Sequence, residues 1–377
     1  ANPKSHGLTA SCCHFAMKLL IVPLISRTSP SASASIFENI VSVIRTRHAV
    51  GICTHLEGRF HHVSLYHSPS PKEQRFSRKD HRSFEGWLKQ EGGASLQYLK
   101  EDAAALQHAM DSFHPDLIIT DSRIAVIPVA RRNGIPVITL VHSTMYHRAE
   151  VPSFCLKGIN AFLSSMGEGQ ILRLRDLYLT CDYRIGFGTV QTDPFPSSTS
   201  ITRIGMMTLS QLSIRNDSTV SIFLTEPSIP ARRLIRVVKE AFLGAPFEVY
   251  ISYPGCQTSN QCNLHFINEP KESLLHRSSI CIHDGSPFIT NICHSFAVPQ
   301  IIIPSTSCIS RFHAFSVRRN GSGVVIDPDQ FDVPTIYEAY RTCIVNTSLQ
   351  EHLRHISSEH LKQSDLTELL HVIASYE

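Results

Sequence analysis

The sequence is poor in charge and has no long apolar run. Among its 377 residues 18% are charged and 42% are hydrophobic, and the formal net charge is only +3. So small a charge gives no support for a protein that binds nucleic acid or an anionic membrane. The longest apolar run, MKLLIVPLI, is far too short to span a bilayer. We therefore expect a cytoplasmic globular protein with no nucleic-acid partner and no transmembrane segment.

Metal-binding and disulfide spacings are absent as well. The chain has 11 cysteines but no C-x-x-C pair. Adjacent Cys12 and Cys13 are poorly placed to share a metal ion, and Cys256 and Cys262 have no matching pair of histidines. We expect most of these cysteines to be reduced, buried and apolar in character. The sequence thus predicts a protein without a metal site and without a resident cofactor.

Short apolar runs alternate with amphipathic stretches along the chain, which predicts an α/β fold with parallel sheets. Two such halves follow one another, and each predicts a Rossmann-like, doubly wound domain. A segment before Met17 shows no periodicity and is interpreted as a leader or tag. The predicted division is a leader or tag at 1–16, an N-terminal domain at 17–208, a C-terminal domain at 209–345, and C-terminal helices at 346–377 that pack back on the N-terminal domain.

Two local predictions concern the N-terminal half. Residues 56–80 are polar and aromatic with scattered prolines, and we interpret them as a loop or insertion. The stretch EGGASLQYLKEDAAALQHAMDSF, residues 91–113, is predicted to form one long helix.

In doubly wound sheets the ligand lies outside the carboxyl ends of the strands. The loops that follow the predicted strands are therefore the places to search for a site. They begin after Leu24, Asp121, His142, Leu224, Ser252, Asn268 and His283.

The order and spacing of several segments resemble those of GT-B glycosyltransferases, in particular the UDP-glycosyltransferase-like group that modifies antibiotics and macrolides. The segments are RTRHAVGICT, FHPDLIITD followed by ARRNGIPVI, SITRIGMM, VPQIIIP and RRNGSGVVIDPDQF. The resemblance covers residues 17–377 and implies a C-terminal helical tail that crosses back to the first domain. It also implies an inverting, metal-independent transfer of a hexose or deoxyhexose from a UDP- or TDP-sugar to a hydroxyl of a small apolar acceptor.

The turn that holds the donor diphosphate in that family is glycine-rich, and here it has one glycine. It reads His283-Asp284-Gly285-Ser286, followed by Pro287, which lacks an N–H donor. Either His283 or Asp284 takes the position of the family's phosphate-binding histidine. Asp284 would repel an anion, or else cap the following helix. His283, Ser286 and, in that helix, Thr290 remain possible donors.

Other donor-site residues are implied by position. Thr225 and Glu226 follow a strand where relatives usually carry Gly and Ser or Thr, and Asn268 ends a further strand. The segment STSCISRFH contains Ser307 but lacks the carboxylate that binds sugar hydroxyls in the family. Arg311 is the nearest cation, which either replaces glycine-loop donors to a phosphate or lies on the surface.

The catalytic base has no obvious counterpart in the first loop, ISRTSPSASAS, which carries Arg27 but no His and no carboxylate before Glu38. His142 and Asp121 are the candidates for the catalytic residues. His142 would contact the acceptor, act as base or be structural. In the family the equivalent of Asp121 often orients the catalytic histidine; its alternative role is to cap a helix.

Three functions remain open from these residues. The first is the glycosyltransferase activity described above, with a nucleotide-sugar and a small apolar acceptor as partners. The second is an inactive glycosyltransferase-like partner or regulator, which the lost glycines and the missing base favour; it would act as a homodimer or with a partner glycosyltransferase. The third is a sugar-nucleotide epimerase or hydrolase of the same fold, which usually shows a cluster of carboxylates and histidines that the sequence does not display.

Overall fold

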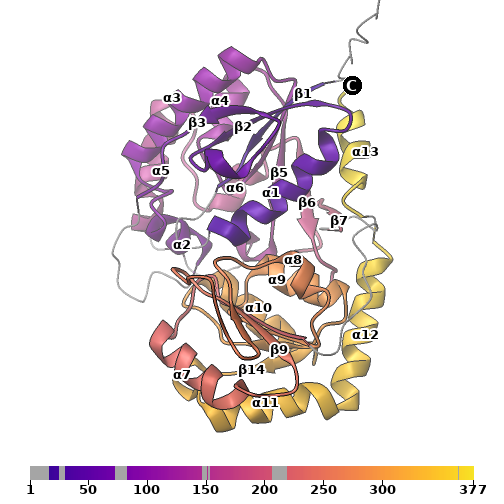
Figure 1. The fold of residues 1–377 in the computed structure, drawn as a ribbon. Helices are drawn as coiled ribbons and strands as arrows, with labels where there is room; N and C mark the ends of the chain where they lie inside the picture. Colours follow the sequence, from indigo (N-terminus) through magenta and orange to yellow (C-terminus); the bar gives the residue numbers. More distant parts are fainter. Residues whose placement is uncertain are drawn as a thin grey trace, which may run out of the picture.

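The computed structural model describes residues 17–24, 30–72, 83–146, 151, 153–205, 219–363 and 365–377, without the side chains of 30–33 and 57. The predicted leader or tag at 1–16 lies outside these residues. The chain forms two α/β domains, each built on a seven-stranded sheet, and they lie one above the other in Figure 1. Because each sheet is covered by helices on both faces, its central strands are almost entirely buried and largely apolar.

The N-terminal sheet has the strand order β3-β2-β1-β4-β5-β6-β7, and all its strand pairs are parallel. Central strand β1 has four fully buried residues in succession, which is why it reads as a continuous apolar run. The strands are β1 Lys18–Val22, β2 Ala49–Thr54, β3 Ser64–His67, β4 Leu117–Asp121, β5 Val137–Val141, β6 Tyr183–Phe187 and β7 Thr202–Ile204.

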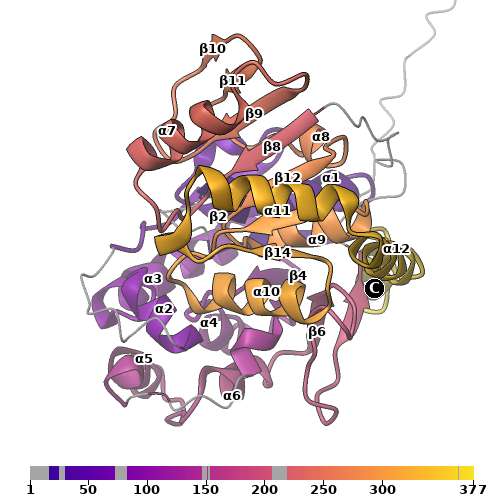
Figure 2. The same ribbon diagram turned by 90° about the horizontal axis from the view of Figure 1, so that it is seen from below.

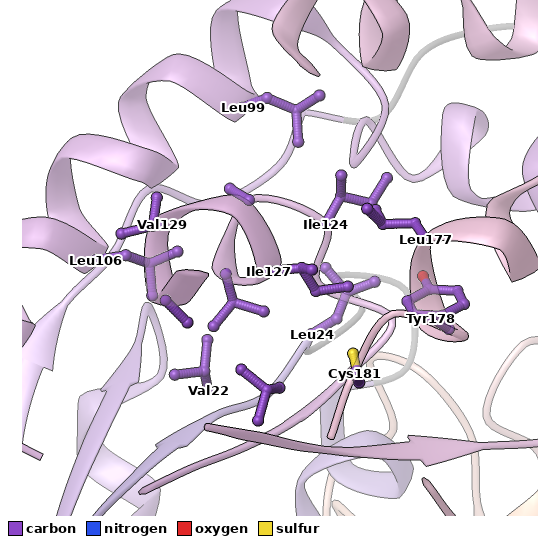
Figure 3. Packing of buried hydrophobic residues seen from close by; sticks show 14 of the residues in the cluster. Val22, Leu24, Leu99, Leu106, Ile124, Ile127, Val129, Leu177, Tyr178 and Cys181 are labelled. Carbon is purple, nitrogen blue, oxygen red and sulfur yellow. The ribbon is translucent and has the colours of Figure 1, made fainter. Parts of the chain in front are cut away.

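Helices cover both faces of this sheet and bury two separate apolar clusters. One cluster includes Leu106, Ile124 and Val129 and lies between helices and the strands, as Figure 3 shows. The other face is covered by α1 together with the last helix of the chain. The elements are α1 Pro30–Ile44, α2 Phe84–Gln90, α3 Leu96–Phe113, α4 Val126–Arg132, α5 Ser153–Ser165 and α6 Leu174–Tyr178, with short 3₁₀ segments η1 Glu57–Arg59 and η3 Ser143–Tyr146.

Two local predictions were wrong in part. The helix predicted over 91–113 begins only at Leu96, because Gly92 adopts a left-handed φ of 84° and Ser95 caps α3 by accepting from the N–H of Tyr98. A Cβ at Gly92 would lie 2.1 Å from the carbonyl oxygen of Lys72, so the backbone itself approaches too closely for another residue. The region predicted as a loop at 56–80 contains β3, which adds an edge strand to the sheet.

The C-terminal sheet has the order β10-β11-β9-β8-β12-β13-β14. Its strand pairs are parallel except β10–β11, which forms an antiparallel edge. The strands are β8 Thr219–Phe223, β9 Glu248–Ser252, β10 Ser259–Gln261, β11 Leu264–Phe266, β12 Ile280–His283, β13 Gln300–Ile302 and β14 Gly323–Val325.

The last helices tie the two domains together. In Figure 1, α12 and α13 run along one side of the molecule, from the C-terminal sheet to the N-terminal one; Figure 2 shows α11 in front of the C-terminal sheet with α12 at its side. Leu366, Leu369 and Ile373 are fully buried in the same cluster as α1. The helices are α7 Ala231–Phe242, α8 Glu272–Leu275, α9 Pro287–Ser295, α10 Cys308–Arg319, α11 Val333–Val345, α12 Thr347–Leu361 and α13 Glu368–Ala374, with 3₁₀ segment η5 Pro328–Gln330.

The predicted α/β architecture, with two Rossmann-like domains and a returning helical tail, is confirmed. Direct contacts join the domains: the hydroxyl of Ser316 in α10 donates to the carbonyl of Thr192, and Arg59 pairs with Glu269. Within the residues that the structure describes, no helix has the length and apolar character needed to cross a bilayer.

Candidate functional site

A cavity of about 180 Å³ lies between the carboxyl ends of the two sheets. Its walls come from loops after β1, β4, β5 and β6 on one side and after β8, β12 and β13 on the other, as expected for doubly wound domains. The lining residues are Leu24, Ile36, Trp87, Asp121, Ser122, Leu140, Val141, His142, Phe187, Asp193, Thr225, Glu226, Asp284, Gly285, Ser286, Pro287, Phe288, Asn291, Ser305, Ser307, Ile309, Ser310 and His313.

Asp121 ends β4 and lines the cavity with a half-buried side chain. Its Oδ1 accepts a hydrogen bond of 2.8 Å from the backbone N–H of Leu24, at the end of β1. Burial raises the pKa of Asp121 to about 7, against the lowering effect of that hydrogen bond and of Arg123. A carboxylate with this pKa is a much stronger base than an ordinary aspartate.

Behind Asp121, a buried ion pair holds the loop in place. Arg123 is 2% exposed and donates through Nε to Asp102, which is fully buried in α3, at 3.0 Å. The same guanidinium donates to the carbonyl of Cys53 at 2.6 Å, so it connects β2, α3 and the loop after β4. Ser122, between Asp121 and Arg123, takes a left-handed φ of 44°. The loop geometry is therefore set by Arg123 and not by a helix cap at Asp121.

His142 lines the cavity directly after β5, as predicted. Its Nδ1 is hydrogen-bonded to the hydroxyl of Thr144, and its ring meets the ring of Phe84 edge-on at 5.1 Å. Burial lowers the pKa of His142 to about 4, so the ring is neutral near pH 7. A neutral imidazole of low pKa is a poorer base than Asp121.

Asp193 is a cavity carboxylate that the sequence reasoning missed. It is 5% exposed and accepts hydrogen bonds from the backbone N–H of Ser143, at 3.1 Å, and from the hydroxyl of the same residue. Burial raises the pKa of Asp193 to about 6. The signal was available, since Asp193 lies in the loop after strand β6, and every loop after a parallel strand is a candidate.

Asp284 is not a helix cap. Its side chain is 2% exposed and turns toward the loop after β8, where the N–H of Thr225 donates to Oδ2 at 2.6 Å. The N–H of Glu226 donates to the same oxygen, and the hydroxyl of Thr225 lies 3.2 Å from both carboxylate oxygens. The residue at the N-cap position of α9 is Ser286, although its side chain makes no capping hydrogen bond. Thr225 and Glu226 therefore line the cavity together with Asp284.

His283 is fully buried and does not line the cavity. Its Nε2 is hydrogen-bonded to Gln300 at 2.9 Å, and its Nδ1 accepts from the N–H of Gly285 at 3.1 Å. Of these two candidates for the phosphate-binding position, Asp284 lines the cavity and His283 does not. Gly285 takes a left-handed φ of 86°, and a Cβ on it would lie 2.7 Å from the carbonyl oxygen of Ser310.

The N-terminus of α9 opens onto the cavity through Gly285, Ser286, Pro287 and Phe288. The hydroxyl of Ser286 is buried and has no hydrogen-bond partner among the described residues, and it does not cap the helix. First-turn N–H groups of a helix lack acceptors within it, and together with the helix dipole they favour an anion. Thr290 is one turn further on, where its hydroxyl donates to the carbonyl of Ser286 at 2.8 Å, and it does not line the cavity.

The remaining predicted residues divide between the cavity and the surface. Ser307 lines the cavity and caps α10 by accepting from the N–H of Ser310 at 3.1 Å. Asn268 and Arg311 are exposed and do not line it. Arg27 lies outside the described residues. The cavity thus brings together Asp121, His142, Thr225, Glu226, Asp284, Gly285, Ser286 and Ser307, but not Asn268, His283, Thr290 or Arg311.

Apolar side chains from both domains complete the cavity. They include Trp87 from α2, Ile36 from α1, Phe187 at the end of β6, Phe288 from α9 and Ile309 from α10. Trp87, the single tryptophan of the chain, was not among the predicted site residues. Among the described residues, no group of three or more His, Cys, Asp or Glu side chains has the arrangement of a metal site.

Comparison with known proteins shows likeness in structure but not in sequence. No protein-family model matches the chain, and no curated protein matches it by sequence. The calicheamicin glycosyltransferase CalG4 superposes with a TM-score of 0.72 at 15% identity, covering 96% of this chain and 98% of the other. The spinosyn rhamnosyltransferase SpnG complexed with thymidine diphosphate gives 0.69 at 15% identity, covering 95% and 100%. The glycosyltransferase VinC in complex with DTDP gives 0.65 at 15% identity, covering 96% and 99%.

The chain has the GT-B fold of these natural-product glycosyltransferases. The fold predicted from the resemblance is therefore confirmed.

Proposed function

We propose that this protein is a glycosyltransferase that moves a hexose or deoxyhexose from a UDP- or TDP-sugar to a hydroxyl of a small apolar acceptor. One observation carries the proposal: a single cavity has an unpartnered serine hydroxyl at a helix N-terminus on one wall and a carboxylate of raised pKa on the other. The first suits a diphosphate and the second suits a general base.

In this proposal the diphosphate of the donor binds at the start of α9. The hydroxyl of Ser286 and the N–H groups of Phe288 and Ile289 donate to its oxygens; Pro287 contributes no N–H. The acceptor lies against the apolar wall that includes Trp87. Because SpnG and VinC were solved with a thymidine diphosphate, TDP-sugars are the first donors to test.

The reaction is a single displacement. Oδ2 of Asp121 takes the proton of the acceptor hydroxyl, and the acceptor oxygen forms a bond to the anomeric carbon. The bond between that carbon and the phosphate oxygen breaks, and the diphosphate leaves with the electron pair. The hydrogen bond from Leu24 holds Oδ1, so in this proposal Oδ2 is the oxygen that takes the proton.

A donor-hydrolysis and transfer assay tests the proposal. The protein is incubated with a panel of UDP- and TDP-hexoses, with and without a mixture of apolar phenols and macrolide aglycones, and release of the nucleoside diphosphate is followed by chromatography. We expect release to increase with an acceptor and a new glycoside to form. No release for any donor would contradict the proposal.

Asp284 favours a second candidate, an inactive glycosyltransferase-like partner or regulatory protein. Its carboxylate accepts the hydrogen bonds of the Thr225 and Glu226 N–H groups. It also lies beside the place where a diphosphate would bind. If the protein does not bind any nucleotide at millimolar concentration, this candidate replaces the first. Co-purification with an active glycosyltransferase, or formation of a homodimer, would then be the property to measure.

A further inference from the structure

The carboxylate of Asp284 occupies hydrogen-bond donors that could otherwise bind the anionic group of a ligand. Two backbone N–H groups, from Thr225 and Glu226, converge on Oδ2 of Asp284, and the hydroxyl of Thr225 reaches both carboxylate oxygens. The main chain of Asp284 is held as well, because its carbonyl accepts from the hydroxyl of Ser310 and from the N–H of Ser305, the latter at 3.3 Å. The carboxylate therefore cannot swing away from the cavity without breaking several contacts.

The position of this carboxylate matters because a second anion is expected beside it. Gly285 and Ser286 follow Asp284 directly, and they line the same cavity at the start of α9. The buried, unpartnered hydroxyl of Ser286 is an independent sign that a polar ligand completes this wall. A diphosphate bound there would meet the negative charge of Asp284 inside a cavity, where like charges repel more strongly than in bulk water.

We propose that Asp284 takes up a proton when a diphosphate binds at the N-terminus of α9, and that it thereby sets the affinity and the pH dependence of donor binding. This inference rests on the proposed function. In this proposal the ionised Asp284 weakens the binding of multiply charged anions. The same side chain connects the loops after β8 and β12.

The groups that face Asp284 do not supply a compensating positive charge. On the loop after β8 there is Glu226, on β12 there are Cys281 and the neutral His283, and on α10 there is His313, whose pKa is lowered to about 3 by burial. Across the cavity lie Asp121, Asp193 and His142. Among the described lining residues there is no Lys or Arg. A proton on Asp284 would reduce the negative charge directly beside the start of α9.

Protonation of Asp284 is compatible with its environment. Burial raises the pKa of this carboxyl, although the hydrogen bonds from Thr225 and Glu226 lower it. A bound dianion raises the pKa further, because like charges disfavour the ionised form. Since the complex then binds more protons than the free protein, affinity for a diphosphate increases as the pH falls.

The test compares the wild type with Asp284→Asn by calorimetric titration between about pH 5 and about pH 8. The asparagine keeps an oxygen for the N–H groups of Thr225 and Glu226, and its amide can donate to the Thr225 hydroxyl. The ligands are UDP, TDP and inorganic pyrophosphate, with uridine and thymidine as uncharged counterparts. Repeating the wild-type titration in buffers of different ionisation enthalpy measures the protons taken up.

We expect Asp284→Asn to bind the diphosphates roughly tenfold more tightly than the wild type at neutral pH, from the cost of one adjacent like charge. The wild type should bind them more tightly at acidic pH with proton uptake, whereas the variant should show neither effect at this site. Uridine and thymidine should bind both proteins equally. Glu226→Gln, which removes a neighbouring carboxylate on the loop after β8, should leave the proton uptake in place. Asp284→Ser is a second variant that removes the charge, and it should show the same gain in diphosphate affinity even if the asparagine perturbs the loop.

The outcomes separate the inference from the proposed function. Wild-type binding of UDP or TDP without pH dependence, and with the affinity of Asp284→Asn, would overturn the inference and leave the glycosyltransferase intact. Tighter, pH-independent binding to the variant without transfer of any sugar would support the inference and count against the transferase. If no diphosphate binds to any of these proteins across the pH range, both fail.

Discussion

Asp121 accepts a hydrogen bond from the backbone N–H of Leu24, with 2.8 Å between Oδ1 and N, and this bond joins the ends of β4 and β1. One carboxylate oxygen is therefore fixed to the sheet while the other is left for the cavity. In the proposed function this hydrogen bond orients Asp121 as the base, and the described part of the first loop offers no histidine for that role.

Asp121→Asn should abolish the transfer activity while leaving donor binding nearly unchanged. The amide oxygen can still accept from Leu24, but it cannot take the acceptor proton, so kcat should fall by roughly 10²- to 10⁴-fold. Initial rates and the Kd of TDP would be measured for both proteins. His142→Asn serves as the comparison: if it removes as much activity as Asp121→Asn, the base is not Asp121 alone.

The pH profile of kcat/KM should be bell-shaped. The base works only when Asp121 is ionised, so activity rises with pH through about 7, the pKa to which burial raises this carboxyl. The affinity for the donor changes with pH in the opposite direction: it falls as the pH rises, because binding is favoured when Asp284 carries a proton. Asp284→Asn should remove the alkaline limb of the curve and keep the acidic one. A single curve shape for both proteins would contradict this assignment.

Arg123→Met should destabilise the protein by about 3–5 kcal/mol, because it leaves the fully buried Asp102 without its partner. Urea unfolding followed by circular dichroism measures the loss. The double variant Arg123→Met/Asp102→Leu should recover much of the stability, since it removes both charges. As a matched control, Arg131→Met breaks a partly exposed pair with Glu168 and should cost about 1 kcal/mol or less.

Gly285→Ala should disturb the turn before α9 more than the same change elsewhere. The left-handed φ of 86° disfavours any side chain, and the new Cβ would lie 2.7 Å from the carbonyl oxygen of Ser310. Gly134→Ala is the control, with a φ of 66° but no atom within 4 Å of its Cβ. Both lose stability through strain of about 1–2 kcal/mol, and Gly285→Ala should lose more than that and also weaken TDP binding. Equal losses for the two variants would show that the contact with Ser310 relaxes freely.

The sequence predicted the strands and their carboxyl ends well, because a strand covered on both faces is largely apolar along its length. That pattern placed Asp121, His142, Thr225 and Ser286 in one region. It could not separate His283 from Asp284, since their orientation depends on how β12 pairs within the sheet. It also missed Asp193, whose partner Ser143 lies 50 residues away along the chain, and the break before α3, which depends on the approach of Lys72 to Gly92.

What the sequence by itself determined is the fold: the alternation of buried strands and amphipathic helices leaves two parallel sheets as the arrangement that covers every apolar face. What only the tertiary structure decided is the chemistry of the cavity. The carboxylate of Asp284 is directed to Thr225, 59 residues earlier, and the pKa of Asp121 is raised by burial under neighbours from other elements. Such effects come from contacts between distant segments, and local sequence patterns carry no record of which segments will meet.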